Sequence, residues 1–348
     1  MTAAPESASL ASATCVWFPR ARCVELRQES LPALGADDVR IETIASAISH
    51  GTEMLVYRGQ VPPRLELDLP TLRGCFGFPI KYGYASVGRV VEVGPSVSEP
   101  RLGALVFVHH PHQTAFVVPA AMAVPLPTDL IDPVLGVFMA NLETAINVVL
   151  DAAPRFGERI VIFGQGVVGL LVTQLARRAG ASRVMVVEPV GRRRELAARL
   201  GADLVLEPCA SLPETIRELT DGMGADIAIE ASGDAAALGQ AIDSVAFQGT
   251  VVVCSWYGTR PVTLELGGAF HRRRVRIVSS QVSTIDPALQ PRWTRQRRLD
   301  LARSLLPQLD LASLVTHRVP IERAAEAYAL VDAQPDQTVQ VVLTYGRV

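Results

Sequence analysis

A short apolar segment that ends in a glycine-rich turn most constrains how this chain folds. It reads Arg159-Ile-Val-Ile-Phe-Gly164-Gln-Gly166-Val-Val-Gly169, and an amphipathic segment follows it. This order predicts a strand, a tight turn at Gly164 and a helix that begins near Val167. In such a unit Gly166 leaves the backbone open to a pyrophosphate, and Gly169 lets the helix pack close to the strand. The pattern predicts a dinucleotide site; the alternative is a strand–helix turn that binds nothing.

A second apolar strand ends in an acidic residue at the spacing that a dinucleotide site needs. The segment 183–188 reads Arg-Val-Met-Val-Val-Glu, so Glu188 follows Gly169 by 19 residues. A carboxylate there accepts hydrogen bonds from the adenosine ribose hydroxyls and repels a 2′-phosphate. Arg192, Arg193 and Arg194 come next and can hold that phosphate instead. The sequence therefore favours NAD, with NADP as the alternative.

The middle of the chain alternates strands and helices. Helical patterns separate most of the apolar strands, as at 192–200, 212–220 and 235–244. Continuous apolar strands with helices between them indicate a parallel sheet that is covered on both faces. The predicted strands are 159–163, 183–188, 203–206, 226–231, 250–255 and 275–279.

The two ends of the chain follow a different pattern. Short alternating strands at 39–44, 86–93 and 115–119 predict an irregular antiparallel barrel. An arginine-rich helical segment at 293–309 and a strand at 338–344 close the chain. The simplest arrangement joins both ends in one domain and inserts the parallel-sheet domain between them.

Composition narrows the class of protein. The 348 residues are 49% hydrophobic and 20% charged, with a net charge of −2, which is typical of a soluble enzyme. This balance gives no reason to expect a nucleic-acid or membrane partner. The five cysteines form no C-x-x-C pair, which favours a reducing cytoplasm. Residues 1–14 lack the pattern of a signal peptide and are expected to form a disordered tail.

The order of these motifs resembles the medium-chain dehydrogenase/reductase superfamily. The resemblance runs from Gly83-Tyr84-Ala-Ser-Val-Gly88 and Glu143-Thr144-Ala145 through the glycine turn to residues 249–256. Segments 47–53 and 270–281 are similar to a zinc-less branch with bacteriochlorophyllide a dehydrogenase-like proteins. The resemblance implies an α/β protein with a GroES-like irregular β-barrel catalytic domain (15–140 and 281–348). It also implies an inserted Rossmann domain (141–280) and a homodimer that pairs near 264–266 and 275–277.

The positions that bind catalytic zinc in the resembling family carry other residues here. Ser49 occupies the place of the first cysteine, and Gly83-Tyr84-Ala85 occupies the place of Gly-His-Glu. The third place, near residues 139–141, has no cysteine, and the four-cysteine structural zinc lobe is missing between residues 94 and 103. Serine and tyrosine are poor zinc ligands. We therefore expect no zinc.

One histidine cluster leaves a metal or substrate role open. His109, His110 and His112 flank Pro111 and account for three of the six histidines. Without a neighbouring acidic residue or cysteine, we interpret the cluster as a loop beside the cleft. Contact of His112 with a substrate and a metal site remain alternatives.

Without zinc, another group must polarise the substrate oxygen and move a proton. The resemblance points the Tyr84 phenol at the nicotinamide cleft, where it can donate a hydrogen bond; the alternative is a packed aromatic ring. Ser49, His50 and Thr52 occupy the loop of the first ligand and of a proton relay. These four residues are the predicted catalytic set.

The remaining predicted site residues contact the cofactor or the substrate. Glu53 and Asn141 are expected to contact the substrate, as is His112; Glu53 can equally pair with an arginine. The cofactor contacts are predicted to be Gly164, Gln165, Gly166, Val167, Val168, Gly169, Glu188, Arg193, Thr144, Ser232, Ser255 and Trp256.

We predict a zinc-independent NAD(P)-dependent oxidoreductase that acts on a small molecule. Hydride would move between nicotinamide and a carbonyl/alcohol pair or a polarised double bond. The alternatives are an enoyl or quinone reductase, which needs only electrostatic support of an enolate, and a non-catalytic NAD(P)-binding protein.

Overall fold

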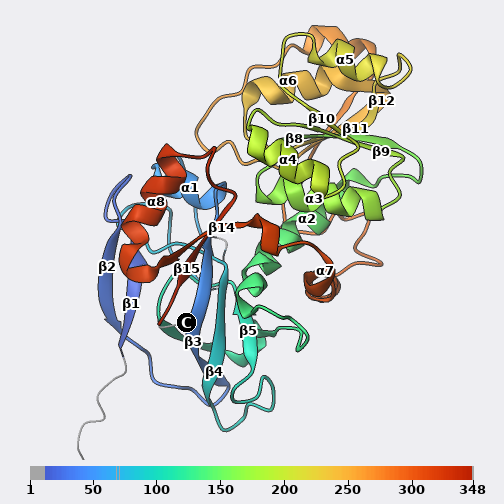
Figure 1. Ribbon diagram of the computed structural model, residues 1–348. Helices are drawn as coiled ribbons and strands as arrows, with labels where there is room; N and C mark the ends of the chain where they lie inside the picture. The colour runs from blue at the N-terminus through green and yellow to red at the C-terminus, as the bar shows by residue number, and fades with distance from the viewer. Residues whose placement is uncertain (1–11, 68, 70, 347–348) are drawn as a thin grey trace, which may run out of the picture.

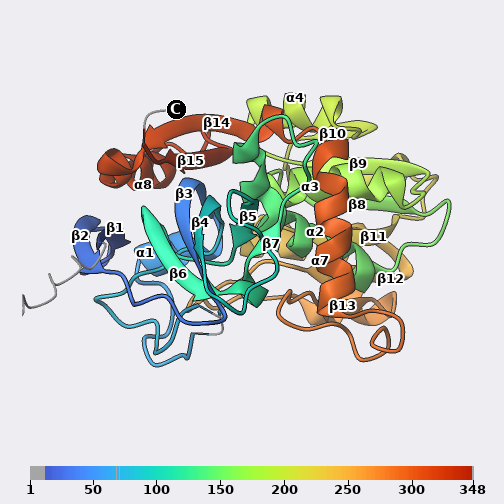
Figure 2. The same ribbon diagram turned by 90° about the horizontal axis from the view of Figure 1, so that it is seen from below.

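The computed structural model describes residues 12–67, 69 and 71–346, and it shows two sheet-based domains joined through helices (Figure 1). One domain is built on a seven-stranded sheet and the other on a six-stranded parallel sheet of the Rossmann type. We call them the sheet domain and the Rossmann domain. The view from below places α2 (Met139–Ala152) and α7 (Arg295–Leu305) where the two domains meet (Figure 2).

The Rossmann domain confirms the predicted alternation of strands and helices. Its strand order is β10-β9-β8-β11-β12-β13, and every pair is parallel. Its strands are β8 (Arg159–Phe163), β9 (Arg183–Val187), β10 (Leu204–Leu206), β11 (Ala225–Glu230), β12 (Val245–Val253) and β13 (Arg276–Ser279). Its helices are α3 (Val167–Arg178), α4 (Gly191–Arg199), α5 (Leu212–Glu218) and α6 (Ala235–Ser244). The strand predicted at 250–255 begins earlier, because Val245 already pairs with Ala225.

The sheet domain brings the two ends of the chain together. Its main sheet has the order β14-β15-β3-β4-β5-β7, and β6 also pairs with β3. The C-terminal strand β15 runs antiparallel to β3, with Leu343 opposite Ser46. Its strands are β3 (Asp38–Ile48), β4 (Ser86–Val93), β5 (Leu105–Val108), β6 (Ala115–Pro119), β7 (Val124–Pro125), β14 (Val315–Pro320) and β15 (Gln340–Thr344). The boundaries proposed at residues 140 and 281 stay a prediction.

Several short elements complete the sheet domain. A two-stranded sheet of β1 (Ser12–Trp17) and β2 (Glu25–Ser30) lies outside the main sheet. The helices are α1 (Thr52–Tyr57) and α8 (Ala324–Ala333). The prediction of a disordered tail at 1–14 is wrong for residues 12–14, because they pair with β2 and Ala13 is buried. The first 11 residues lie outside the described part of the chain.

A continuous apolar core connects the two domains. The largest cluster joins Val87 of β4, Leu142 of α2 and Ile162 of β8. Helix α2 is therefore packed between the domains. Among the described residues, the segment Pro133–Ala152 is apolar and long enough to cross a membrane, but 72% of that window is buried inside the protein. We interpret it as the core helix.

Candidate active site

The glycine turn after β8 has the backbone geometry that close approach of a phosphate needs. Gly164 has φ +89°, and a Cβ there would lie 2.7 Å from the backbone of Ser232. A Cβ on Gly169 would lie 2.0 Å from the Gly164 carbonyl oxygen, so only glycine lets α3 pack this close to the turn. A Cβ on Gly166 would meet open space, since nothing lies within 4 Å. The turn is therefore tightly packed behind and open in front, where the N-terminus of α3 begins.

Glu188 lies directly after β9 and is bonded to that turn. Its side chain is buried, one carboxylate oxygen accepts from the Gln165 backbone N–H at 2.6 Å, and the other accepts from the Val190 N–H at 3.0 Å. The acid expected to bind ribose thus also holds the conformation of the glycine turn.

The three arginines that follow Glu188 all have partners within the protein. Arg192 donates to the carbonyl oxygen of residue 337, and Arg193 donates to those of residues 335 and 338. Arg194 donates to the Glu188 and Pro189 carbonyl oxygens and pairs with Glu207. Each of these guanidinium groups therefore already donates to an acceptor within the protein, and none is reserved for binding a 2′-phosphate.

Three buried nitrogen atoms near the domain junction have no hydrogen-bond partner. Among the described residues these are His50 Nε2, Arg193 Nε and His317 Nδ1. They come from the loop before α1, from α4 and from β14. Burial, followed by the charges of Arg193, Arg58 and His317, lowers the pKa of His50 to about 3. The Arg193 Nε–H lacks an acceptor, which a dinucleotide pyrophosphate would supply, and each imidazole nitrogen can donate in the same way when it carries the ring proton. Nothing in the sequence singled out His317.

A second buried carboxylate, Glu230 at the end of β11, organises the loop behind the glycine turn. One oxygen accepts from the backbone N–H groups of Ser232 and Gly233 and from the Ser232 hydroxyl, at 2.7–2.8 Å. The other accepts from the Tyr257 hydroxyl at 2.9 Å. Ser232 is therefore fixed against Gly164. Sequence reasoning missed Glu230, although an acid that ends an apolar strand resembles Glu188 in pattern.

The loop that contains the predicted cofactor contacts Ser255 and Trp256 reaches the sheet domain. Trp256 is partly exposed and its ring lies 5.7 Å from that of Phe76. The next residues dock on the turn that follows α1, because the Thr259 N–H donates to the Gln60 carbonyl oxygen at 3.0 Å. From Phe76 a row of aromatic rings continues to Tyr82 and then to Tyr84, the candidate catalytic residue.

Tyr84 and Ser49 are brought into direct contact. The Tyr84 hydroxyl donates to Ser49 Oγ at 2.6 Å. Burial and, to a smaller extent, the nearby charge of Glu53 raise the pKa of Tyr84 to about 12, against the opposing effect of hydrogen bonds with Ser49 and Thr52. The phenol therefore keeps its proton at neutral pH and can donate it in a hydrogen bond. Thr52 begins α1, so the predicted loop residues lie on either side of the start of this helix.

Glu53 and His112 form a buried pair behind Ser49. Both side chains are fully buried, and His112 Nε2 lies 2.8 Å from Glu53 Oε1. The other ring nitrogen of His112 lies 2.6 Å from Ser46 Oγ. Glu53 thus pairs with a histidine and not with an arginine. In this arrangement neither side chain has exposed surface for the substrate contact expected of it.

The three clustered histidines point to separate partners. His110 stacks on Phe116 with ring centroids 3.9 Å apart, and burial lowers its pKa to about 3. His109 Nε2 lies 3.6 Å from a carboxylate oxygen of Glu143. Within the described part of the chain, no group of three or more His, Cys, Asp or Glu residues is arranged to hold a metal ion. The arrangement of the described residues gives the metal alternative for this cluster no support.

The N-terminal half of α2 carries the other predicted contacts. The Thr144 hydroxyl donates to the Ala140 carbonyl oxygen at 3.0 Å, and Asn141 lies 3.4 Å from the side chain of Gln340. Glu143 binds the buried guanidinium group of Arg298 at 2.8 Å. The Thr144 bond stays within α2, whereas the bonds of Asn141 and Glu143 anchor the helix to β15 and to α7. Contact of Thr144 or Asn141 with a ligand stays a prediction.

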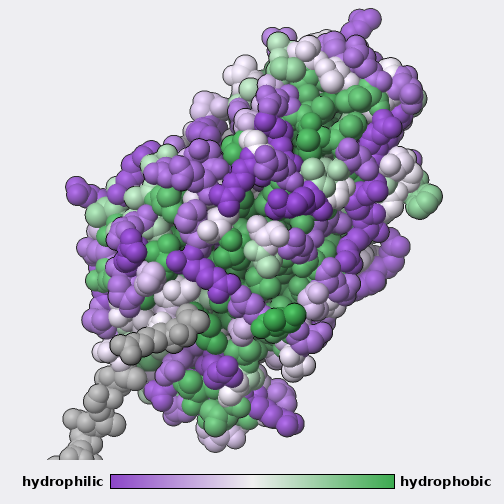
Figure 3. All heavy atoms as spheres, viewed as in Figure 1, coloured by the Kyte–Doolittle hydropathy of each residue, from purple (hydrophilic) through white to green (hydrophobic). Residues whose placement is uncertain are grey.

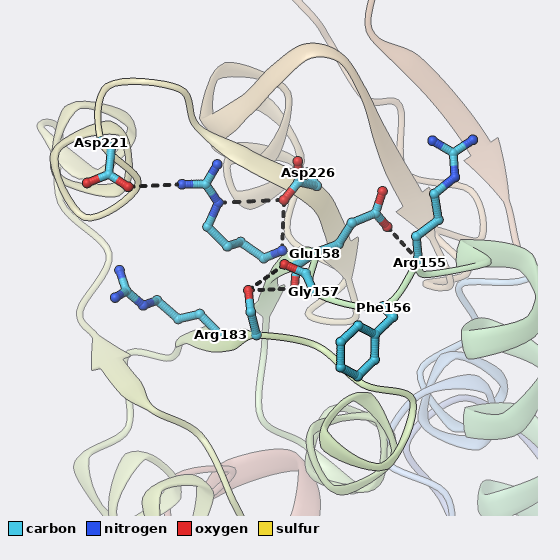
Figure 4. Close-up of a pocket in the computed structure, with 9 residues that line it drawn as sticks. Arg155, Phe156, Gly157, Glu158, Arg183, Asp221 and Asp226 are labelled. Carbon is cyan, nitrogen blue, oxygen red and sulfur yellow. Dashed lines mark hydrogen bonds and ion pairs between the residues drawn. The ribbon is translucent and has the colours of Figure 1, made fainter.

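A hollow at the opposite edge of the parallel sheet differs from this site. Its lining comes from the N-terminal ends of the parallel strands and includes Arg155, Phe156, Arg183, Asp221 and Asp226 (Figure 4). The glycine turn and Glu188 follow the C-terminal ends of the same strands, so the hollow cannot belong to the predicted cofactor site.

Figure 3 shows hydrophilic side chains over much of one face, with hydrophobic ones gathered over the Rossmann domain toward the upper right.

Comparison with known proteins agrees with this geometry. The family model for zinc-binding dehydrogenases matches residues 167–295. The chain is 29% identical over 336 residues to D-guloside 3-dehydrogenase of Escherichia coli K12, which covers 90% of this chain and 94% of that protein. It is 30% identical over 343 residues to 2-desacetyl-2-hydroxyethyl bacteriochlorophyllide A dehydrogenase of Cereibacter sphaeroides, with 91% and 93% covered.

A solved structure supports the fold. A protein of Sinorhizobium meliloti 1021, described as a zinc-binding dehydrogenase and bound to NADP, matches with a TM-score of 0.76 at 22% identity. The match covers 96% of this chain and 99% of that one. The similarity to the bacteriochlorophyllide dehydrogenase extends over nearly the full length of both chains. The chain therefore belongs to the zinc-type medium-chain dehydrogenase/reductase superfamily.

Proposed function

We propose that this protein is a zinc-independent, NAD-preferring oxidoreductase that interconverts an alcohol and a carbonyl compound. The observation that carries the proposal is the hydrogen bond of 2.6 Å between Tyr84 and Ser49, two residues that replace metal ligands of the resembling family. The phenol offers a hydrogen-bond donor where the family uses a metal. The names of the guloside and hydroxyethyl bacteriochlorophyllide dehydrogenases support an alcohol substrate.

The donor set near Tyr84 argues against a zinc ion at this position. Zinc needs three or four sulfur, imidazole or carboxylate ligands that converge. Here the hydroxyl groups of Tyr84 and Ser49 bond each other, and the pKa of Tyr84 is raised to about 12, so the phenol resists the deprotonation that a ligand would need. Asn141 at the third place is directed to Gln340. These residues do not fit the metal.

The cofactor region does fit a nicotinamide dinucleotide. The open face of Gly166 and the N-terminus of α3 suit the pyrophosphate. The unpartnered Nε of Arg193 offers a further donor, as do the unpartnered ring nitrogens of His50 and His317 when they carry the proton. Glu188 would accept the ribose hydroxyls and repel a 2′-phosphate, while terminal nitrogens of Arg192, Arg193 and Arg194 already donate to acceptors within the protein. This combination supports NAD over NADP.

The residues of the site divide the chemistry among them. The nicotinamide ring, when bound, supplies or accepts the hydride. In the reducing direction Tyr84 Oη donates a hydrogen bond to the substrate carbonyl oxygen and stabilises the negative charge that develops there. To do so the phenol turns its single proton from Ser49 Oγ to the substrate, and the Ser49 hydroxyl then donates to Tyr84 Oη and keeps it in position. The hydroxyl groups of Ser49 and Thr52 offer a route for the proton that the alkoxide takes up.

Enoyl or quinone reduction is the second candidate. A tyrosine whose pKa is raised to about 12 is a weak acid, which suits hydrogen bonding to an enolate oxygen without full proton transfer. The same cofactor and the same phenol would serve this reaction, so only the substrate distinguishes it from the first.

One assay separates carbonyl reduction, enoyl or quinone reduction, and cofactor binding without catalysis. Purified protein of known metal content, dialysed against a chelator, is incubated with NADH or NADPH and a panel of ketones, aldehydes, enals and quinones. Turnover of ketones or aldehydes without bound zinc supports the proposal, and turnover of enals or quinones alone supports the second candidate. Cofactor binding without turnover across the panel indicates a non-catalytic protein. Activity that disappears with zinc and returns on its addition contradicts zinc independence.

Two further expectations belong to this proposal. The protein is proposed to form a homodimer through the edge strand β13, where Ile277 and the nearby Leu266 are partly exposed. Pairing would satisfy the backbone groups of an open sheet edge. The cysteines in the described residues are all free, which fits the expected cytoplasmic location.

A further inference from the structure

We propose that Glu53 and His112 are positioning residues that hold the Ser49–Tyr84 hydrogen bond from both of its sides. This inference rests on the proposed function and names residues that do not touch substrate or cofactor themselves. It explains why a fully buried carboxylate lies behind the candidate catalytic loop.

Glu53 fixes the position of Ser49. It lies in the first turn of α1, and its Oε2 accepts from the Ser49 backbone N–H at 3.0 Å. The side-chain oxygen of the same serine accepts from Tyr84 at 2.6 Å. Because one residue receives both bonds, a shift of the Glu53 carboxylate would move the acceptor of the Tyr84 hydroxyl.

His112 fixes the Glu53 carboxylate through an ordered chain of hydrogen bonds. The chain runs from the Tyr345 hydroxyl to Ser46 Oγ at 2.6 Å, from Ser46 to His112 Nδ1 at 2.6 Å, and from His112 Nε2 to Glu53 at 2.8 Å. If Tyr345 donates at the start, each member accepts one bond and donates the next. In this order His112 Nε2 carries a proton and donates it to Glu53, while Nδ1 accepts from Ser46.

The ring of His112 also packs against the residue before Tyr84. Gly83 has φ +135°, and a Cβ there would lie 2.7 Å from both Cδ2 and Nε2 of the His112 ring. The backbone just before Tyr84 therefore passes so close to the imidazole ring that only glycine fits there. His112 touches the Tyr84 side of the hydrogen bond by packing and the Ser49 side through Glu53.

Three hydrogen bonds satisfy the Glu53 carboxylate without an arginine or lysine partner. It accepts from the Ser49 N–H, from His112 and from the Tyr328 hydroxyl. No arginine or lysine of the described residues forms an ion pair with it. Loss of one donor would leave a buried carboxylate oxygen without that hydrogen bond, and the carboxylate would have to shift toward another donor.

Two substitutions of His112 separate positioning from packing. His112→Gln places an amide near Nε2, which can still donate to Glu53, whereas His112→Asn can reach only Ser46. We expect His112→Asn to lower kcat by roughly 10- to 100-fold, the scale of a misplaced catalytic group, with KM and cofactor Kd changed less than about threefold. His112→Gln should retain kcat within about threefold of wild type.

Two controls distinguish this effect from loss of stability. Ile41→Val truncates another buried residue of the same strand as Ser46, in a separate apolar cluster, and should lower the unfolding temperature without changing kcat. In a Tyr84→Phe background, His112→Asn should cause little further loss of kcat, because the hydroxyl that it positions is gone.

The outcomes distinguish failure of the proposed function from failure of the positioning role of Glu53 and His112. No turnover by wild-type protein refutes the proposed function and this inference with it. Wild-type turnover with an unchanged kcat in His112→Asn, or with equal losses in the Asn and Gln variants, refutes positioning alone. Should His112→Asn not fold, Glu53→Gln takes its place: kcat must fall at least roughly tenfold with cofactor Kd unchanged, and a smaller loss overturns the inference.

Discussion

Replacing Glu188 by glutamine should shift cofactor preference from NAD toward NADP. The carboxylate is buried and both of its oxygens accept backbone N–H groups, at 2.6 and 3.0 Å. Glutamine keeps the shape and one carbonyl acceptor, but it loses the charge that favours the ribose hydroxyls and repels a 2′-phosphate. Charge-assisted hydrogen bonds contribute about 1–3 kcal/mol, so the ratio of the two dissociation constants should change by roughly 5- to 150-fold.

The assay is a titration of wild type and variant with NADH and NADPH, followed by nicotinamide fluorescence. Glu188→Ala provides a contrast, because it leaves two backbone N–H groups without an acceptor and should also lower the unfolding temperature. A ratio for Glu188→Gln within twofold of wild type, with both proteins folded, would refute the placement of Glu188 at the adenosine ribose.

Four further outcomes follow from the structure. His50→Gln should weaken NADH binding several-fold without loss of unfolding temperature, as isothermal titration and thermal melts can show. The folded pKa of His110 is lowered to about 3 from 6.5, so its contribution to stability is complete above pH 6.5 and is lost as pH falls toward 3. His110→Phe should therefore reduce the pH dependence of unfolding in this window by about 1.4 kcal/mol per pH unit. Glu230→Gln should loosen the loop behind the glycine turn, raising cofactor Kd more than KM for the substrate. Light scattering should give a molecular mass of twice the chain mass of 37.4 kDa for wild type and of one chain for Ile277→Arg. A wild type with the mass of one chain would refute the dimer.

The Rossmann half of the fold was predictable because its signals are local. A glycine turn, an apolar strand and the helix after it lie within about 20 residues, and each confers its geometry through backbone sterics and burial. The carboxylate of Glu188 was also predictable from spacing. The early start of β12 was not, since the pairing of Val245 with Ala225 depends on how two strands align in the folded sheet.

The network behind Tyr84 was beyond the reach of local patterns. Ser46 and Tyr345 are 299 residues apart and meet only because β15 pairs with β3. Glu53 and His112 were recognised as polar residues near the site, but their mutual pairing depends on tertiary packing. The resemblance to a family placed Tyr84 and Ser49 in one cleft, and the structure adds the contact between their hydroxyl groups.

The most direct test of the account is kcat for Tyr84→Phe, measured on zinc-free enzyme with the best substrate of the panel. Loss of one donor to a developing oxyanion in a dry cleft lowers kcat by roughly 10²- to 10³-fold, or about 2.7–4 kcal/mol. Cofactor Kd and unfolding temperature should stay close to wild type, and Ser49→Ala should cause a smaller loss. A Tyr84→Phe enzyme with kcat within a few-fold of wild type would contradict the assignment of the phenol as the group that replaces the metal.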